Sequence, residues 1–254
     1  MRRVFVDSID GGQAVLTGGE HKHLSVVLRA KKGDKFALVC GDGFVYGGVI
    51  EKIEREKTTV KIVDKTADTT EPNILCDLYL GMIKGEHLEI AVQKAVELGV
   101  NNIYPLLTQN AVKTGVNLER LNKIALEAAK QCGRGRLPKV LAPKTFDEAY
   151  KALKRYDLAV FPYEKADKLS IKEFLDAYAA AIKSSAFAVD STKKIAVIIG
   201  SEGGFTAEEA AKMSEIATPV SLGARILRAD TAAIVAIIAV MYAFDELSVG
   251  GEKK

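Results

Sequence analysis

The chain has 254 residues, of which 48% are hydrophobic and 27% are charged, so it is neither a disordered chain nor one too short to bury a core. At roughly 150 residues per domain, this length allows about two domains. The 36 Lys and Arg residues exceed the 33 Asp and Glu residues by a net charge of only +3, so any affinity for nucleic acid must come from a local basic patch.

The sequence gives no sign of export, of a membrane span or of a metal site. Its cysteines, Cys40, Cys76 and Cys132, form no CxxC pair, and its three histidines cannot complete a familiar zinc motif. The start of the chain lacks the apolar stretch of a signal peptide, and the longest apolar run, residues 232–244, is much shorter than the roughly 20 residues that span a bilayer. We therefore expect a cytoplasmic protein with reduced cysteines and no metal ion.

The first seventy residues predict a small β-barrel made of short strands and tight turns. The predicted strands are residues 4–7, 36–40, 44–50 and 58–64. Gly41-Asp42-Gly43 joins the middle two as a hairpin turn, and a short helix is expected from Glu20 to about Arg29. A polar segment, residues 64–73, then predicts the boundary between one domain of residues 1–70 and another of residues 71–254.

From residue 74 onward, strands and helices alternate along the chain. The predicted strands are residues 74–83, 100–106, 158–161, 195–199 and 219–222. The predicted helices are residues 86–98, 118–132, 171–183, 206–217 and 229–245. This order predicts an α/β domain with a mainly parallel sheet and helices on both faces.

Two late loops carry the chemistry that the sequence offers. The first, Gly200–Gly204, follows a buried strand and precedes a helix that opens with a capping box of Thr206 and Glu209. It is neither a Walker A loop nor a GxGxxG loop, so on its own a tight structural turn would explain it. The second, Ser221–Thr231, places a glycine, two arginines and an acid before the wholly apolar helix.

Arg225 and Arg228 lie three residues apart in the second loop, so on a helical turn they would share one face. A solvated surface would explain two arginines equally well. The residues that follow Arg228 are apolar, however, and this favours a place for Arg228 at the junction of core and cleft. Loops at the carboxyl ends of parallel strands are the usual ligand sites of α/β proteins.

The stretches IGSEGGFTAEE and LGARILRADTA resemble the signature of the RsmE family, the 16S ribosomal RNA uracil-N3 methyltransferases of the SPOUT class. The stretches MRRVFVD, HKHLSVVLR, KGEHLEIAVQKAVELGV and EAAKQCGRGRLP, and the glycine-rich hairpin, follow in the family's order and spacing. The chain departs from the family at Ser201, where proline is usual, and at Asp230, where glutamate is usual. It also lacks the tryptophan that the family commonly carries before Lys123.

The resemblance implies a C-terminal SPOUT-type parallel sheet with a deep trefoil knot, and an N-terminal PUA-like β-barrel that grips RNA. It also implies a homodimer with the knot at the interface. The apolar helix at residues 232–244 fits such an interface, because a helix that is hydrophobic all round must be covered on every side. Burial within the core of one chain would explain that helix equally well.

The resemblance further implies that three loops, residues 162–164, 200–204 and 221–231, bind S-adenosylmethionine. The residues expected to hold this cofactor are Phe161, Pro162, Ile199, Gly200, Glu202, Gly203, Ser221, Leu222, Gly223, Ile226, Leu227, Arg228, Thr231 and Ala232. Apolar members would form the walls, and a carboxylate would suit the cationic sulfonium. For catalysis we expect Arg228 to stabilise the uracil anion, with Glu202 or Asp230 as the base or as the group that orients it.

The RNA partner implied by the resemblance is 16S ribosomal RNA in the small ribosomal subunit. The residues expected to contact it are Arg2, Arg3, His23, Arg29, Lys84, Gln131, Arg134 and Arg136. The basic segment 130–139 would also suit a solvated helix end, and His23 alone would suit a partly buried structural histidine. Two other functions stay open: a ribose 2′-O-methyltransferase of the same class, and a non-catalytic RNA-binding protein with a relic cofactor pocket.

Overall fold

The computed structural model describes residues 3–111, 115–184 and 192–248. Contacts divide the chain into two units, which are treated separately below. Unit 1 contains Met1–Glu71 together with Ala129–Leu137, and unit 2 contains Pro72–Ala128 together with Pro138–Lys254. Because the units are defined by contacts alone, the expected division into folding domains of residues 1–70 and 71–254 stays a prediction.

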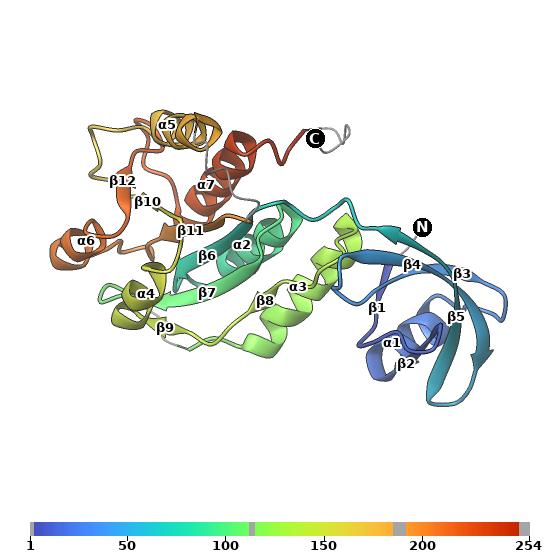
Figure 1. Ribbon diagram of the computed structural model, residues 1–254. Coiled ribbons are helices and arrows are strands. Elements are labelled where there is room, and N and C mark those ends of the chain that lie inside the picture. The colour runs from blue at the N-terminus through green and yellow to red at the C-terminus, as the bar shows by residue number, and fades with distance from the viewer. Residues whose placement is uncertain (1–2, 112–114, 185–191, 249–254) are drawn as a thin grey trace. The chain divides into compact units, whose positions relative to one another are not determined.

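Unit 1 is built on a curled sheet with the strand order β1-β3-β4-β5-β2 (Figure 1). Its elements are β1 (Arg3–Phe5), β2 (Gln13–Thr17), α1 (Gly18–Lys22), the π-helical turn η1 (His23–Val27), β3 (Lys35–Val39), β4 (Phe44–Ile53) and β5 (Lys57–Ala67). Side chains from the concave face enclose a core that includes Leu16, Leu24 and Leu38. Within the described residues β1 and β2 are not paired with each other, so the expected barrel is a half-barrel.

The local predictions for unit 1 are largely confirmed. The expected short helix is present as α1 and η1, and it ends before Arg29, whose φ of 51° lies in the left-handed region. The strand β2 was not predicted. Its alternation of buried and exposed residues covers only five positions, and Gly11 and Gly12 directly before it are residues typical of a turn.

Unit 2 contains a sheet in which every strand pairing is parallel. The strand order is β12-β10-β11-β6-β7-β8, and β9 also pairs with β7. Its strands are β6 (Leu75–Gly81), β7 (Asn102–Leu107), β8 (Lys139–Val140), β9 (Lys144–Thr145), β10 (Leu158–Pro162), β11 (Lys194–Ile199) and β12 (Thr218–Val220). Its helices are α2 (Gly85–Glu97), α3 (Leu118–Cys132, whose last residues belong to unit 1), α4 (Phe146–Leu153), α5 (Ile171–Ser184), α6 (Ala207–Met213) and α7 (Ala229–Ala243).

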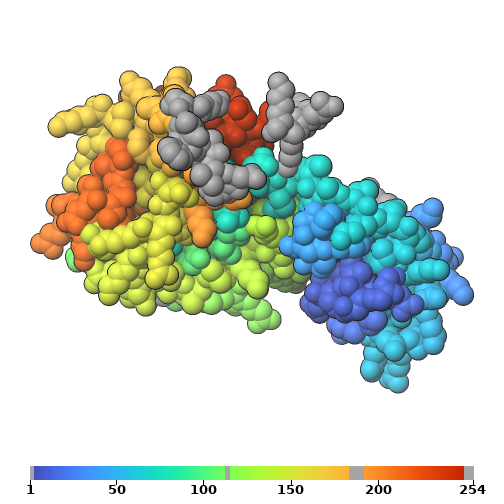
Figure 2. All heavy atoms as spheres, in the orientation of Figure 1, coloured from blue at the N-terminus to red at the C-terminus, as the bar shows by residue number. Residues whose placement is uncertain are grey.

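Helices cover both faces of this sheet, as a buried parallel sheet requires. On one face, side chains of α4 and α6 pack with alternate residues of the strands, among them Tyr79, Phe161 and Ile198. Figure 2 shows α4 and α6 side by side on the surface, where Lys212 of α6 forms an ion pair with Asp147 of α4. On the other face, α7 packs against α2, α5, β6 and β11. The α/β class with a parallel sheet is therefore confirmed.

Most predicted elements of unit 2 are present with ends that differ by one to a few residues, whereas α4, β8 and β9 were not predicted. In the apolar helix α7, Ala233, Ala236, Ile237, Val240 and Met241 are buried. None of the helices in the described parts of the chain is long and apolar enough to cross a membrane. The knot that the resemblance implies stays a prediction.

Candidate functional site

Four strands of the sheet, β6, β10, β11 and β12, send their carboxyl ends to one edge, where the loops that follow them surround a cavity of about 610 Å³. All residues that line this cavity belong to unit 2. Of the residues predicted to hold a cofactor, those on the cavity wall are Pro162, Ile199, Gly200, Glu202, Ser221, Leu222, Gly223, Ile226, Leu227, Arg228 and Ala232. The three predicted loops therefore meet at one place.

Three predicted cofactor residues do not line the cavity. Phe161 is fully buried, and its ring stacks on Tyr163 and meets the edge of Phe205. Gly203 is exposed in the first loop, and its carbonyl accepts a hydrogen bond from the side chain of Asn110 at 2.9 Å. Thr231 is exposed, and its backbone N–H donates to the Asp230 carboxylate at 2.8 Å.

The first loop is held against the end of β6 by direct contact between backbones. A Cβ atom added to Gly81 would lie 2.1 Å from the backbone nitrogen of Ser201, closer than real Cβ contacts allow. Only glycine permits this approach, so Gly81 fixes where residues 200 and 201 pass β6. The hydroxyl of Ser201 is buried, 3.4 Å from that of Thr108, which accounts locally for serine in place of the family's proline.

The second loop leaves β12 through a short turn. The Ser221 hydroxyl accepts a hydrogen bond from the backbone N–H of Gly223 at 3.2 Å, and Gly223 has a φ of +110°, which few residues other than glycine adopt. The backbone N–H of Ser221 also donates to Leu169 at 2.9 Å. The loop therefore starts from a fixed point, while Ile226 farther along exposes 88% of its surface at the cavity.

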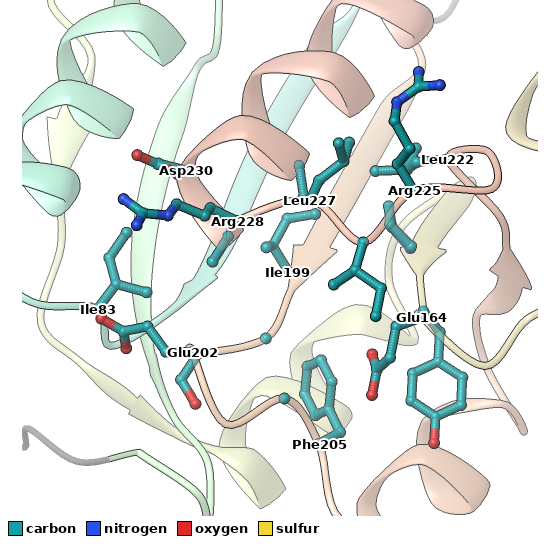
Figure 3. Close-up of a pocket in the computed structure, with 18 of the residues that line it drawn as sticks. Ile83, Glu164, Ile199, Glu202, Phe205, Leu222, Arg225, Leu227, Arg228 and Asp230 are labelled. Atoms are coloured by element: carbon teal, nitrogen blue, oxygen red, sulfur yellow. The ribbon is translucent and has the colours of Figure 1, made fainter.

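The cavity has a charged end and a more apolar middle (Figure 3). Arg228, Asp230 and Glu202 lie together at one end, near Ile83. Glu164 and Phe205 lie on the opposite side of the cavity, and the side chain of Arg225 points away from both. Between these ends the walls are formed by side chains such as Ile199 and Leu227.

Two hydrogen bonds connect the charged end to the start of helix α2. The backbone N–H of Lys84 donates to Glu202 Oε1 at 2.8 Å. His87 Nδ1 lies 2.8 Å from Asp230 Oδ2. Partial burial acts to raise the pKa of the Asp230 carboxyl, but hydrogen bonds from His87 and from the Thr231 N–H outweigh it, and the pKa lies below its ordinary value.

Arg228 directly precedes helix α7 as its N-cap residue, and its side chain is exposed at the cavity. Among the described residues, no hydrogen bond or ion pair joins its guanidinium to another side chain, so its five N–H donors are available to a ligand. An arginine with this freedom, beside two carboxylates and an apolar wall, suits an anionic, planar group.

The residues predicted to contact RNA are distributed over both units. Lys84 is exposed at the cavity in unit 2. The others that the structure describes belong to unit 1, and they are Arg3, His23, Arg29, Gln131, Arg134 and Arg136; Arg2 lies outside the described residues. Of these, Arg29, Gln131 and Arg136 are exposed. His23 is half-buried, whereas His21 is buried and its Nδ1 lies 2.9 Å from Thr58 Oγ1.

Two predicted RNA contacts are engaged in ion pairs within unit 1. Arg3 lies 3.2 Å from Asp68. Arg134 is only 4% exposed and pairs with Glu71, at 2.5 Å from Nη2 and 3.1 Å from Nε. The Glu71 carboxylate also accepts the backbone N–H groups of Gly135 and Arg136. The structure thus gives Arg134 a structural task, and its predicted contact with RNA stays a prediction.

Sequence reasoning missed His87 and Phe205 as residues of the cavity wall, whereas Glu164 lies in the predicted loop of residues 162–164. His87 carried a usable signal. It lies in the first turn of the helix after β6, and the carboxyl end of β6 shares its edge of the sheet with the two glycine-bearing loops. Within the described chain, no group of three His, Cys, Asp or Glu side chains gathers as a metal site would require.

Comparisons with known proteins agree with this architecture. A family model described as an RNA methyltransferase domain matches residues 70–241, and one described as an RNA methyltransferase PUA domain matches residues 16–63. The chain is 29% identical over 234 residues to the ribosomal RNA small subunit methyltransferase E of Bacillus subtilis, with 89% of each chain covered. It is 32% identical over 238 residues to the Synechocystis protein of the same name, with 92% of this chain and 74% of that one covered.

A solved structure shares the whole fold. It is that of a candidate methyltransferase from Legionella pneumophila in complex with the bound cofactor SAM, with 27% sequence identity, a TM-score of 0.78, and 95% of this chain and 97% of that chain covered. The resemblance in the sequence motifs, the parallel sheet with its half-barrel partner, and these matches all agree. The chain therefore belongs to the RNA methyltransferase family that includes the ribosomal RNA small subunit methyltransferases E.

Proposed function

We propose that this protein uses S-adenosylmethionine to methylate N3 of a specific uridine in the 16S ribosomal RNA of the small ribosomal subunit. The observation that carries the proposal is the single cavity at the carboxyl edge of the parallel sheet, where the glycine loop of residues 200–204 and the arginine-bearing loop of residues 221–231 meet. The names of the curated relatives support the RNA substrate. Its site of action would be the cytoplasm.

The residues of the cavity fit S-adenosylmethionine. Its volume lies in the range of about 300 to 1,000 Å³ that is usual for ligand pockets. Apolar walls from Ile199, Leu222 and Leu227 suit the adenosine, and the carboxylates of Glu202 and Asp230 suit a neighbouring cation. The Legionella relative was solved with this cofactor. When bound, S-adenosylmethionine supplies an electrophilic methyl group on a sulfonium sulfur, which is left as a neutral thioether.

The chain's own residues then have three tasks. Uracil N3 carries a proton at neutral pH, so a base must accept it as the nitrogen becomes a nucleophile. Arg228, exposed and without a described partner, would stabilise the negative charge that develops on the uracil oxygens, as an oxyanion site does. The loops that enclose the cavity would exclude water and hold the two reacting groups in line.

We also propose that the protein acts as a homodimer. Helix α7 is apolar on all sides, yet Ile238 exposes 40% and Tyr242 exposes 76% of its surface. An apolar helix face of this kind is stabilised when a second chain covers it.

The test of the activity uses small ribosomal subunits from cells that lack the corresponding methylation. Purified protein and labelled S-adenosylmethionine are added to small subunits, to naked 16S ribosomal RNA and to large subunits, and the RNA is digested and analysed by mass spectrometry. We expect 3-methyluridine from small subunits only. A 2′-O-methylated nucleoside would support the ribose methyltransferase, and cofactor binding without any product would support the relic pocket.

The role of Arg228 has its own test. Arg228→Ala is expected to lower the rate of methyl transfer about 10²- to 10³-fold, which is the usual cost of removing one donor to a developing anion. Arg155 serves as the control. It is exposed in the turn before β10, whereas the cavity lies at the carboxyl end of that strand, so Arg155→Ala is expected to react at the wild-type rate. An Arg228→Ala protein with wild-type turnover would remove this residue from the mechanism.

A further inference from the structure

His87 and Asp230 form a hydrogen-bonded pair at the charged end of the cavity. They lie in the first turns of α2 and α7, two helices that pack together, and 143 positions separate them in the sequence. The distance from His87 Nδ1 to Asp230 Oδ2 is 2.8 Å. The Asp230 side chain is 13% exposed and that of His87 is 45% exposed, so the carboxylate is covered while part of the imidazole remains open.

The pair fixes the protonation pattern of the imidazole. The pKa of Asp230 lies below its ordinary value, so this carboxyl is ionised at neutral pH and can only accept hydrogen bonds. Nδ1 of His87 must therefore be the donor. In the neutral ring, Nε2 then carries a lone pair, and within the described chain no hydrogen bond to a protein group occupies it.

We propose that His87 is the general base of the methylation: its Nε2 accepts the proton of uracil N3, while Asp230 holds the ring through Nδ1. This assignment rests on the proposed function and deepens it. The N3–H bond breaks, and its proton forms the new Nε2–H bond. The electron pair left on N3 forms the N–C bond to the methyl group, whose former C–S pair stays on the sulfur. The imidazolium returns the proton to water through its exposed edge.

The neighbouring groups make the imidazole the better base. Base catalysis is most efficient when the pKa of the base lies near the working pH, where imidazoles titrate and ordinary carboxylates do not. Glu202 already accepts the backbone N–H of Lys84. The charged groups that line this end of the cavity with His87 are Asp230 on α7, Glu202 and Arg228 on the loops, and Lys84 at the start of its own helix; Glu86 precedes His87 in the sequence. Arg228 would bind the uracil oxygens while His87 takes the proton.

The first experiment needs no catalysis. The chain contains only three histidines, so the ring nitrogens of His87 can be assigned in a long-range ¹H–¹⁵N NMR spectrum by comparison with the His87→Asn protein. We expect the neutral ring to carry its proton on Nδ1, and Asp230→Asn to abolish that preference. A ring that carries its proton on Nε2 in the wild-type protein would overturn the proposal.

The second experiment measures single-turnover methylation of small subunits. The Asn side chain of His87→Asn keeps an N–H group that can donate to Asp230, but it has no basic nitrogen to accept the proton of uracil N3. We therefore expect a methylation rate about 10²- to 10⁴-fold lower, with unchanged cofactor affinity by calorimetry. The wild-type rate is expected to fall in acid, because a protonated imidazole cannot accept the N3 proton, and His87→Asn to lose that dependence. Added imidazole is expected to restore turnover to His87→Ala.

The matched control is Gln93→Ala, an exposed position on the same helix, which is expected to react at the wild-type rate. If the wild-type protein methylates uracil N3 and His87→Asn retains its rate, the general base is another group and the proposal is wrong. If the wild-type protein transfers no methyl group to small subunits, the proposed function fails, and this assignment fails with it. Wild-type turnover therefore separates the two cases, and the NMR experiment tests the His87–Asp230 pair without turnover.

Discussion

At the scale of single residues, the site depends on positions that only one type of residue can occupy, and Gly81 is the example. Gly81 ends the strand β6 where the backbone of Ser201 crosses it, and a Cβ atom there would also lie 2.4 Å from the carbonyl carbon of Gly200. Both obstructing atoms belong to the backbone, so no side chain can move to relieve the contact. The geometry of the first loop is thus fixed from outside the loop itself.

We predict that Gly81→Ala destabilises the protein by about 3 kcal/mol or more, the upper end of what overpacking usually costs. It should also weaken cofactor binding, because the loop that forms the cavity wall must shift. Urea denaturation and calorimetry would measure the two effects. Gly19→Ala in helix α1 is the matched control, since its Cβ would meet nothing within 4 Å; equal stability of the two variants would contradict the prediction.

At this scale, the sequence could predict site residues that lie close together along the chain, but not pairs of residues that lie far apart along it. Gly200–Gly204 and the run from Ser221 to Thr231 are contiguous, so their glycines and charges could be recognised together. The partners of His87 and Arg134 lie 143 and 63 positions away, and no local pattern indicates such pairs. For that reason His87 was missed, and the ion pair of Arg134 with Glu71 was not foreseen.

At the scale of elements, the start of α6 was predictable because its signals are local, although the same capping box at Thr145 and Glu148 did not lead to a prediction of α4. Thr206 Oγ1 accepts the Glu209 N–H at 3.1 Å, and the Glu209 carboxylate accepts the Thr206 N–H at 3.0 Å, as the sequence predicted. Glu209 also accepts the N–H of Gln109 at 2.9 Å, so the same side chain fastens the end of β7 to α6. The short strands β8 and β9, with two residues each, carry no periodic pattern and could not be predicted.

We predict that Thr206→Ala lowers the free energy of unfolding by about 1 kcal/mol, the usual cost of a lost N-cap. Glu209→Ala should cost more, because it removes a buried side chain and leaves two partly buried backbone N–H groups without their acceptor. Thermal or urea denaturation would compare the two proteins. The idea would be wrong if Thr206→Ala proved to be the more damaging change.

A polar network on β6 predicts how stability responds to alkali. Asp77 accepts hydrogen bonds from the Tyr156 hydroxyl at 2.6 Å and from the Asn102 N–H at 2.8 Å, and the Tyr79 hydroxyl lies 3.3 Å from that of Tyr156. Burial raises the pKa of Tyr79 to about 12, and burial together with the hydrogen bond to Asp77 raises that of Tyr156.

Since these pKa values are raised on folding, their contribution to stability is complete below about pH 10 and is lost as the pH rises above it. Each such tyrosine should steepen the loss by up to about 1.4 kcal/mol per pH unit. We therefore predict that Tyr79→Phe flattens the decline of the unfolding free energy between about pH 10 and pH 12 relative to the wild type. Urea denaturation across this range measures it, and parallel curves for the two proteins would refute the prediction.

At the scale of the whole molecule, the packing within one chain does not account for the apolar composition of α7. Beyond its first turn the helix is built from apolar side chains, yet it leaves Ile238 and Tyr242 exposed. The sequence could indicate that this helix needs cover on all sides, but not whether its own chain or a second one supplies it. The path of the chain through a knot is likewise invisible to periodicity, because no residue preference marks a threaded loop.

If α7 lies in a dimer interface, Ile238→Asp should separate the chains, because a charge buried without a partner at the centre of an interface costs at least about 2 kcal/mol. Sedimentation velocity over a range of concentrations would then show a dimer for the wild type and a monomer for the variant. Val26→Asp, at an exposed valine of unit 1, is expected to leave the association unchanged. A wild-type protein that sediments as a monomer throughout would exclude the homodimer.

The discontinuous first unit has a consequence for how the protein is made. The partners of Glu71 described above lie in the segment that ends at Leu137, which is synthesised 66 positions later. At roughly 5 to 20 residues per second, the nascent half-barrel waits about 3 to 13 seconds before Glu71 can exchange water for this ion pair. A fragment cut after residue 71 for separate expression would lack the ion pair permanently, whereas one that carries the later segment on a short linker could form it.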